Sequence, residues 1–237
     1  MRSTARSLTV LLLGLFAAAV YASPGLPSNL LALIPGDRSA EVGEILADPT
    51  FVRGLDFETP ADLQVYTYLL DHPDLNAALA QALGVASYRV VRIGPRQYRG
   101  DDGGSNAGTI EVFSAEGHER AFLERGVSSG WWFGEIEGRV LALIVLSTEG
   151  EGVRGTATVW AHIDHGVVDR LLRLLQPMLG GFLDRKLREQ FSIPARVAEA
   201  AYQHPGEFCS LLGALSGGSP AEREALAGLA GCRAVES

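Results

Sequence analysis

Cysteine is scarce in this sequence of 237 residues, which has only Cys209 and Cys232. Neither belongs to a CxxC motif or has a neighbouring histidine, so the sequence gives no sign of a redox or nucleophilic cysteine. A GxSxG elbow, a P-loop and a GxGxxG turn after a strand are also missing, which removes common signatures of hydrolases and nucleotide-binding enzymes. We therefore lean towards a protein that is not an enzyme, and we expect no cofactor.

Positive charge is in short supply, with 20 Lys and Arg against 28 Asp and Glu and a formal net charge of −8. Because nucleic-acid binding depends on clustered Lys and Arg, we expect no nucleic-acid partner. The same balance argues against electrostatic attachment to anionic lipid. Any transient membrane contact would have to rest on apolar side chains.

The N-terminal apolar run, Leu8 to Ala19, is shorter than the roughly 20 residues that a bilayer-spanning helix needs. It follows Arg2 and Arg6 and ends at Val20-Tyr21-Ala22, the order that a secretory signal peptide requires. We interpret residues 1–22 as that peptide and expect an exported protein, in the periplasm or outside the cell. A disulfide persists in an oxidising compartment. We therefore expect Cys209 and Cys232 to pair, with two buried free thiols as the alternative.

The segment His162-Ile-Asp-His165 gathers three side chains that could bind a metal. A catalytic zinc site takes three protein ligands, and an HxHxDH motif would need a histidine where this chain has Trp160. Alternation along a strand also separates the group. We therefore predict that Asp164 is the N-cap of the following helix, and we expect no metal.

Several prolines break residues 23–58, which we interpret as an arm laid over the domain. Thr59-Pro60-Ala61-Asp62 is typical of a helix start, and two short helices separated at His72-Pro73 follow. Between Ser87 and Ile163 the pattern changes to a period of two with glycine-rich turns. It predicts about five or six antiparallel strands in a meander.

A long helix is predicted at residues 166–190, where apolar residues form one broad stripe. Pro177 should bend this helix, and Gly180-Gly181 should leave room for another backbone or for a guest molecule. Tight packing without a cavity is the alternative. Short helices that begin at prolines follow, and we interpret residues 192–237 as a cap clipped by the cysteines.

This order of elements, with TPADLQVYTYLLDHPDL as the tandem helices and IDHGVVDRLLRLLQPMLGGFLDRKLREQF as the long helix, resembles the helix-grip family, the START or SRPBCC group. The resemblance covers residues 59–191. It implies an α+β fold in which a curved antiparallel sheet of about five to seven strands grips a long C-terminal helix. It also implies an apolar ligand such as a lipid, sterol or polyketide between helix and sheet. The family's usual opening strand has one candidate here, FVRGLDF.

We assign the ligand-facing side of the sheet by choosing the more aliphatic alternate residues of each strand. The chosen residues are Val91 and Ile93, then Ile110 and Val112, then Ala121, Leu123, Arg125 and Val127, and finally Ala157, Val159, Ala161 and Ile163. Arg125 is the odd charge on this face, and it either pairs with a carboxylate, meets the polar head of a ligand, or extends to solvent. The opposite face carries Phe113, Phe122 and Trp160, which the arm or the C-terminal helices would have to cover.

The run Trp131-Trp132-Phe133 would line the entrance of a pocket, dip into a lipid surface or plug the core. The predicted ligand-binding residues are Arg125, Val112, Leu123, Val127, Trp132, Leu175, Met178 and Phe182. The prediction is an exported carrier or sensor for a small apolar molecule. A cyclase or dehydratase on the same fold is one alternative, with Arg125, Tyr66, Tyr88 and Tyr98 as candidate acids or bases. A structural envelope protein with a solidly packed sheet is the other.

Overall fold

The computed structural model describes residues 30–232, with gaps at 105, 115–116, 131–133 and 151. The predicted signal peptide and the aromatic run that contains Trp132 lie outside the described residues. The helices are α1 (Leu30–Leu33), the 3-10 turn η1 (Gly36–Arg38), α2 (Ser39–Ala47), α3 (Leu63–Asp71), α4 (Pro73–Ala82), α5 (Gly166–Gln203), α6 (Pro205–Ala214) and α7 (Pro220–Leu229). The strands are β1 (Phe51–Thr59), β2 (Arg89–Gly94), β3 (Gln97–Asp101), β4 (Asn106–Ser114), β5 (Glu119–Gly130), β6 (Gly134–Glu149) and β7 (Gly152–Ile163).

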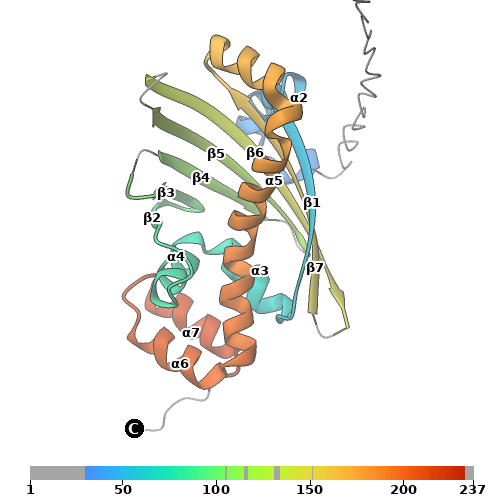
Figure 1. Cartoon of the computed structure of the whole chain (residues 1–237). Coiled ribbons are helices and arrows are strands. Elements are labelled where there is room, and N and C mark those ends of the chain that lie inside the picture. Colours follow the sequence, from blue (N-terminus) through green and yellow to red (C-terminus); the bar gives the residue numbers. More distant parts are fainter. Residues whose placement is uncertain (1–29, 105, 115–116, 131–133, 151, 233–237) are drawn as a thin grey trace, which may run out of the picture.

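In the described part of the chain, the strands form a seven-stranded antiparallel sheet in the order β1-β7-β6-β5-β4-β3-β2, which curves around α5 (Figure 1). The helix-grip α+β fold is therefore confirmed. The stretch FVRGLDF lies within β1, which pairs with β7 from Phe51 opposite Ala161 to Thr59 opposite Val153. The predicted boundary between arm and domain at residues 58 and 59 is therefore wrong, because it places an edge strand of the sheet in the arm.

The tandem helices form where the capping residues predict them. Asp62 caps α3 by accepting hydrogen bonds from the backbone N–H groups of Gln64 (2.7 Å) and Val65 (3.1 Å). Pro73 stands in the first turn of α4, where a missing N–H costs nothing. Tyr66 and Leu69 of α3 and Leu75 of α4 are fully buried, so both helices are fixed by packing under the sheet.

The helix α5 begins at Gly166, as predicted, but its N-cap is not the predicted Asp164 and its C-terminal end lies beyond the predicted one. His165 is the N-cap, since its Nδ1 accepts from the Val168 N–H at 3.4 Å, whereas Asp164 accepts from Arg139 at 2.7 Å. At the other end α5 continues through Pro194 to Gln203 instead of ending near residue 190. The turns after Pro194 bury Val197 and Ala198, and this apolar burial offsets the hydrogen bond that a proline removes.

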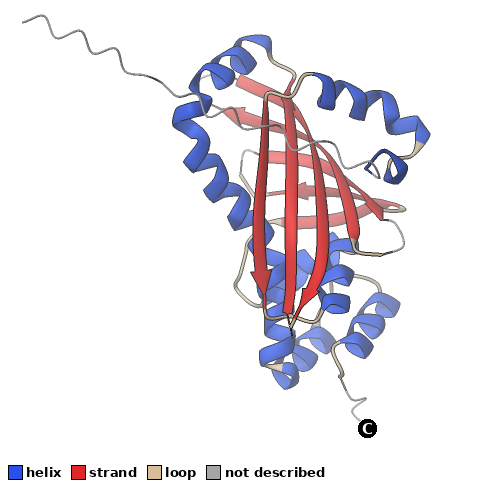
Figure 2. Ribbon diagram, turned by 90° about the vertical axis from the view of Figure 1, so that its right-hand side faces the viewer, coloured by secondary structure: helices blue, strands red, loops and turns tan. Residues whose placement is uncertain are grey.

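Helices cover both faces of the sheet (Figure 2). On the side of α5, the core contains Tyr66, Leu75, Phe122, Ile144 and Val159. On the other side, α1 and α2 of the arm cover Phe113, Leu123, Leu141, Leu143 and Trp160. The arm therefore protects Phe113 and Trp160 from water, as the sequence suggested. Phe122 is the exception, since it faces α5.

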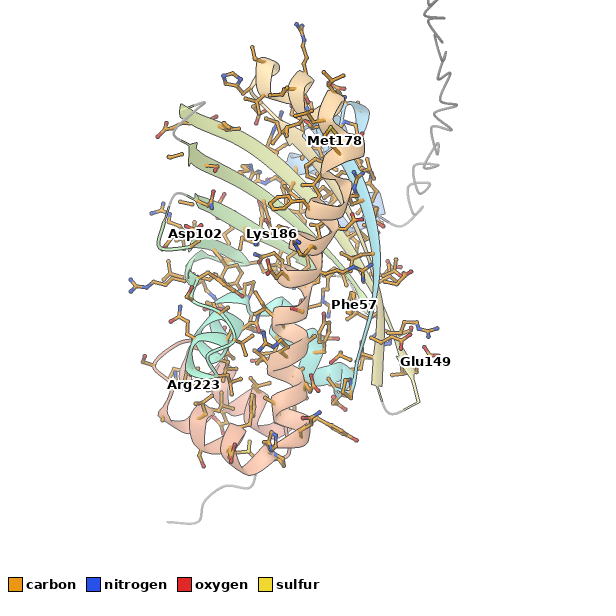
Figure 3. The ribbon with its side chains drawn as sticks, in the orientation of Figure 1. Phe57, Asp102, Glu149, Met178, Lys186 and Arg223 are labelled. Carbon is orange, nitrogen blue, oxygen red and sulfur yellow. A yellow bond between two sulfur atoms is a disulfide. The ribbon has the colours of Figure 1, made fainter. Side chains whose placement is uncertain are left out.

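The N-terminal half of α5 leaves apolar side chains exposed to water. Leu174 is 75% exposed, Met178 82% and Phe182 49%. Figure 3 shows Met178 on the part of α5 that lies away from α4 and the C-terminal helices. The helices of the described segments are all too short or too polar to cross a membrane.

The C-terminal helices α6 and α7 pack under α3 and α4 (Figure 1). A capping box between Ser219 and Glu222 starts α7, and the Tyr68 hydroxyl donates to the Glu222 carbonyl at 3.0 Å. Cys209 and Cys232 form a disulfide, as predicted.

Loss of this disulfide should lower the free energy of unfolding. The bond closes a loop between cysteines separated by 23 residues, and the chain-entropy model gives about 3 kcal/mol for such a loop. We expect the Cys209→Ala, Cys232→Ala double variant to show this loss in chemical denaturation without a reductant. The same variant should not respond to added reductant, whereas the parent should. Equal stability of parent and variant would contradict the prediction.

Candidate functional site

A cavity of about 580 Å³ lies between the curved sheet and the helices α3, α4 and α5. Most of its walls are apolar: Leu69, Leu70, Val90, Ile110, Phe122, Val140, Ala142, Ile144, Val159, Ile163, Leu187 and Phe191 contribute to the lining. Ligand sites of drug-sized molecules have volumes of roughly 300–1,000 Å³ and mainly apolar walls. A smaller hollow of about 430 Å³ between β1 and α5 has charged walls at Asp56, Glu58 and Arg188. The larger cavity is the candidate site.

The cavity stays open because α5 is docked along one edge of the sheet. Phe191 of α5 stacks on Phe57 of β1, and Thr50, just before β1, donates to Asp169 at 2.5 Å. Further along the same edge Arg53 forms an ion pair with Asp184 at 3.4 Å. These contacts hold α5 against β1 and β7, so the faces of β4, β5 and β6 are left partly uncovered.

A row of glycines across the sheet adds to this space. Gly100, Gly108, Gly126 and Gly138 stand directly opposite one another on β3, β4, β5 and β6, and all of them line the cavity. Residues opposite one another in an antiparallel sheet share a face. The row therefore removes side chains from one continuous band of the concave face. At Gly108 the backbones are so close that an added Cβ would lie 2.5 Å from the Arg125 carbonyl oxygen.

Glu124 is the charged residue that the sequence reasoning missed. It stands opposite Ile110 of β4 and Val140 of β6, so its side chain points to the α5 side of the sheet and reaches the cavity. Within the described chain it makes no hydrogen bond and no ion pair. Its surface is open to the cavity, but protein surrounds it, and this burial raises the pKa of the Glu124 carboxyl. Burial and the nearby charge of Glu124 raise the pKa of Tyr88 to about 12.

The predicted face of β5 is wrong. Leu123 stands opposite Glu111 and Leu141 and is buried in the core under the arm, not in the cavity. Arg125 shares that outer face, where its guanidinium donates to Glu41 of α2 and lies 3.7 Å from Glu111. Arg125 thus pairs with carboxylates of the fold, one of the outcomes considered for it.

The physical reason for this error is that both faces of β5 are covered. Counting aliphatic residues cannot distinguish two faces of a strand when both faces are buried. The pairing register can, because Val112 of β4 stands opposite Phe122 and therefore shares a face with Phe122 and not with Leu123. The same error affects β2, where Val91 and Ile93 are 56% and 48% exposed and Val90 lines the cavity. The choices of Ile110, Val159 and Ile163 agree with the cavity lining.

The other predicted site residues are scattered. Val127 contributes to the cavity lining, whereas Val112 is 1% exposed inside the core and is not part of the lining. Leu175, Met178 and Phe182 lie on α5 before the cavity begins, since its lining takes Leu187, Gln190, Phe191 and Pro194 from that helix. The prediction chose the wrong turns because it ended α5 too early and centred the cavity on Gly180-Gly181. Trp132 lies outside the described residues.

Among the three tyrosines proposed as acids or bases, Tyr88 is the one in the cavity lining as far as the described residues show. The Tyr98 hydroxyl donates to the Asp71 carbonyl at 3.1 Å and accepts from Arg92 at 3.2 Å, so it has a structural role. The Tyr66 hydroxyl is buried without a hydrogen-bond partner in the described structure, and burial raises its pKa. It lies in the core, next to Phe57.

The segment His162-Ile-Asp-His165 is the corner between β7 and α5. His162 Nδ1 lies 2.7 Å from the Asp48 carbonyl oxygen, and His165 caps α5. Among residues 30–232 outside the gaps, no group of three side chains is arranged to hold a metal ion.

Taken together, the sheet, the gripping helix and the cavity define a helix-grip architecture. Solved structures with a similar fold include a conserved protein from Geobacillus kaustophilus (18% identity, TM-score 0.47, covering 63% of this chain and 95% of that one). A START superfamily protein from Mycobacterium smegmatis has 14% identity and a TM-score of 0.38, covering 60% of this chain and 97% of that one. The di-domain ARO/CYC StfQ from the steffimycin biosynthetic pathway has 14% identity and a TM-score of 0.42, covering 70% of this chain and 56% of that one. No family model and no curated protein matches the chain in sequence.

Proposed function

We propose that this protein is an exported binding protein for a small apolar molecule, which it holds between the sheet and α5. The observation that carries the proposal is the cavity of about 580 Å³ with mainly aliphatic and aromatic walls. Burial of apolar surface stabilises a complex by about 25 cal/mol per Å² before the costs of association. Export rests on the order of charged, apolar and small residues in segment 1–22.

Protein purified from its own host should carry the ligand. Native mass spectrometry is expected to show an adduct of a few hundred daltons, the size of molecule that a cavity of this volume holds. Extraction with organic solvent should remove the adduct and recover the molecule for identification. The polypeptide mass should correspond to a chain that begins at Ser23. A single adduct-free species, together with no molecule in the extract, would contradict the proposal.

The carboxyl of Glu124 favours an enzyme of cyclase or dehydratase type as a second candidate, since a carboxyl that faces the cavity beside Tyr88, with its pKa raised by burial, can exchange a proton with a ligand. The two candidates differ in the fate of the ligand. A binding protein returns the extracted molecule unchanged after prolonged incubation. An enzyme converts it, and the Glu124→Gln variant does not.

A further inference from the structure

We infer, building on the proposed function, that the bound molecule carries a group that donates a hydrogen bond to Glu124. A protonated amine is the strongest donor of this kind. Molecules headed by a carboxylate or a phosphate are rejected. The proposal thus names a ligand class for the cavity: an apolar body with a cationic or donating group.

The first argument is the position of Glu124. Its cross-strand neighbours on the same face are Ile110 and Val140, and Phe122 precedes it on that face of β5. These apolar side chains offer no hydrogen bond, and the carboxylate has no partner among the described residues. The Glu124 carboxylate is therefore exposed to the cavity without a protein donor, so a ligand that supplies a donor is favoured over one that does not.

The second argument is the sign of the charges around the cavity. Acidic residues in the lining are Asp101, Asp102 and Glu124. Arg125 is the basic residue in the described lining, and its guanidinium is bound by Glu41 and Glu111 on the outer face. Glu124 within the cavity and the two exposed aspartates at its mouth therefore present negative charge to a ligand. Because like charges repel more strongly away from water, an anionic head group is disfavoured.

The acidic groups at the mouth have a separate explanation. Asp102 lies in the connection between β3 and β4 (Figure 3), where it accepts from the backbone N–H groups of Gly104 at 2.8 Å and Asn106 at 3.1 Å. Asp101 accepts from the Gly103 N–H at 3.1 Å. Both carboxylates shape this turn, so they add to the negative field without being free to bind a ligand. Glu124 is left as the recognition group.

The test compares three probes that share one chain: dodecylamine, 1-dodecanol and dodecanoic acid. Isothermal titration of the full-length mature protein near neutral pH is expected to give dodecylamine the highest affinity, about tenfold or more above dodecanoic acid, with 1-dodecanol between them. Glu124→Gln should weaken dodecylamine by about tenfold or more and leave 1-dodecanol within about twofold. Glu137→Gln is the matched control, because Glu137 lies on β6 outside the cavity lining.

The pH profile separates recognition from a structural role. Other titratable side chains of the lining are Tyr88, Asp101, Asp102 and Arg125. The hydrogen bonds from Asn106 and Gly104 lower the pKa of Asp102, and burial raises that of Tyr88, so both move away from neutral pH. Because the ionised form of Glu124 binds the cation, dodecylamine affinity should rise with pH as this carboxyl, whose pKa burial raises, loses its proton in the parent, and it should stay flat in Glu124→Gln.

Each outcome of the titration decides a separate claim. If dodecanoic acid binds as tightly as dodecylamine, or if Glu124→Gln keeps the affinity for dodecylamine, the inference on the ligand class is overturned, while binding of 1-dodecanol still supports the proposed function. If none of the three probes binds the parent protein, the cavity is not a site for apolar molecules. The proposed function then fails together with the inference.

Discussion

Replacing Gly126 with phenylalanine is expected to abolish retention of the apolar ligand, with a loss of affinity of about a hundredfold or more, while the fold is preserved. Gly126 lies in the middle of the glycine row and lines the cavity, so a side chain there projects into the space that the ligand occupies. An added Cβ would meet only the Ala107 carbonyl oxygen, at 3.8 Å, which is an ordinary contact. A hundredfold loss corresponds to about 2.7 kcal/mol.

The measurement is native mass spectrometry and isothermal titration with 1-dodecanol, alongside circular dichroism to confirm folding. Gly54→Phe is the matched control, because Gly54 is an exposed strand glycine of β1 with no atom within 4 Å of an added Cβ. It should keep the affinity of the parent. Gly108→Phe is unsuitable, since a Cβ there collides with backbone at 2.5 Å. Full retention of the ligand by a folded Gly126→Phe variant would place the binding site elsewhere.

The fold could be predicted from the sequence because its signals are local. Asp62 and Pro73 begin α3 and α4 where the capping pattern predicts them, and glycine-rich turns separate the strands. Short connections between strands force an antiparallel meander. Order and type of these elements are enough to recognise a helix-grip protein, even though the strand β1 was assigned to the arm. That strand pairs with β7 from a distant part of the chain, and nothing local in FVRGLDF predicts the pairing.

The site could not be predicted in the same way because it depends on which residues share a face across the whole sheet. Glu124 and Arg125 are neighbours in the sequence, and each stands among apolar alternate residues of β5. Their roles follow from the register, which places Glu124 opposite Ile110 and Arg125 opposite Thr109. A shift of one residue exchanges the two faces. The arm also hides the distinction, because α2 buries the outer face that would otherwise look polar.

The length of α5 shows a related limit. A proline inside a helical pattern predicts an end or a kink, so Ser192 and Pro194 were interpreted as the start of a new element. In the structure Pro194 lies inside α5 and lines the cavity, and the following turns bury Val197 against the core. Tertiary packing thus overrides the local signal. The ligand-facing turns of α5 consequently lie nearer its C-terminus than the sequence indicated.

Removing the charge of Asp71 is expected to destabilise the protein by about 2–4 kcal/mol, the largest single-residue effect on stability that we predict. Arg120 of β5 is 5% exposed, and its guanidinium donates to both oxygens of Asp71, at 2.7 and 2.9 Å. In Asp71→Asn the buried guanidinium loses its counter-charge, although its bonds to the carbonyl oxygens of Gly117 and Glu119 persist. The cost lies toward the lower end for buried pairs because the Asp71 side chain is 26% exposed.

Chemical denaturation measures this loss as a change in the free energy of unfolding. Glu58→Gln is the control, because Glu58 pairs with Arg154 where both side chains are at least half exposed, and such pairs contribute about 0–1 kcal/mol. The paired replacement Asp71→Leu with Arg120→Met should recover much of the stability, since it removes both charges and leaves none buried alone. This recovery is expected because most of the loss in Asp71→Asn comes from leaving the charge of a buried arginine without a counter-charge. Equal losses in Asp71→Asn and Glu58→Gln would show that solvent screens the Arg120 site after all.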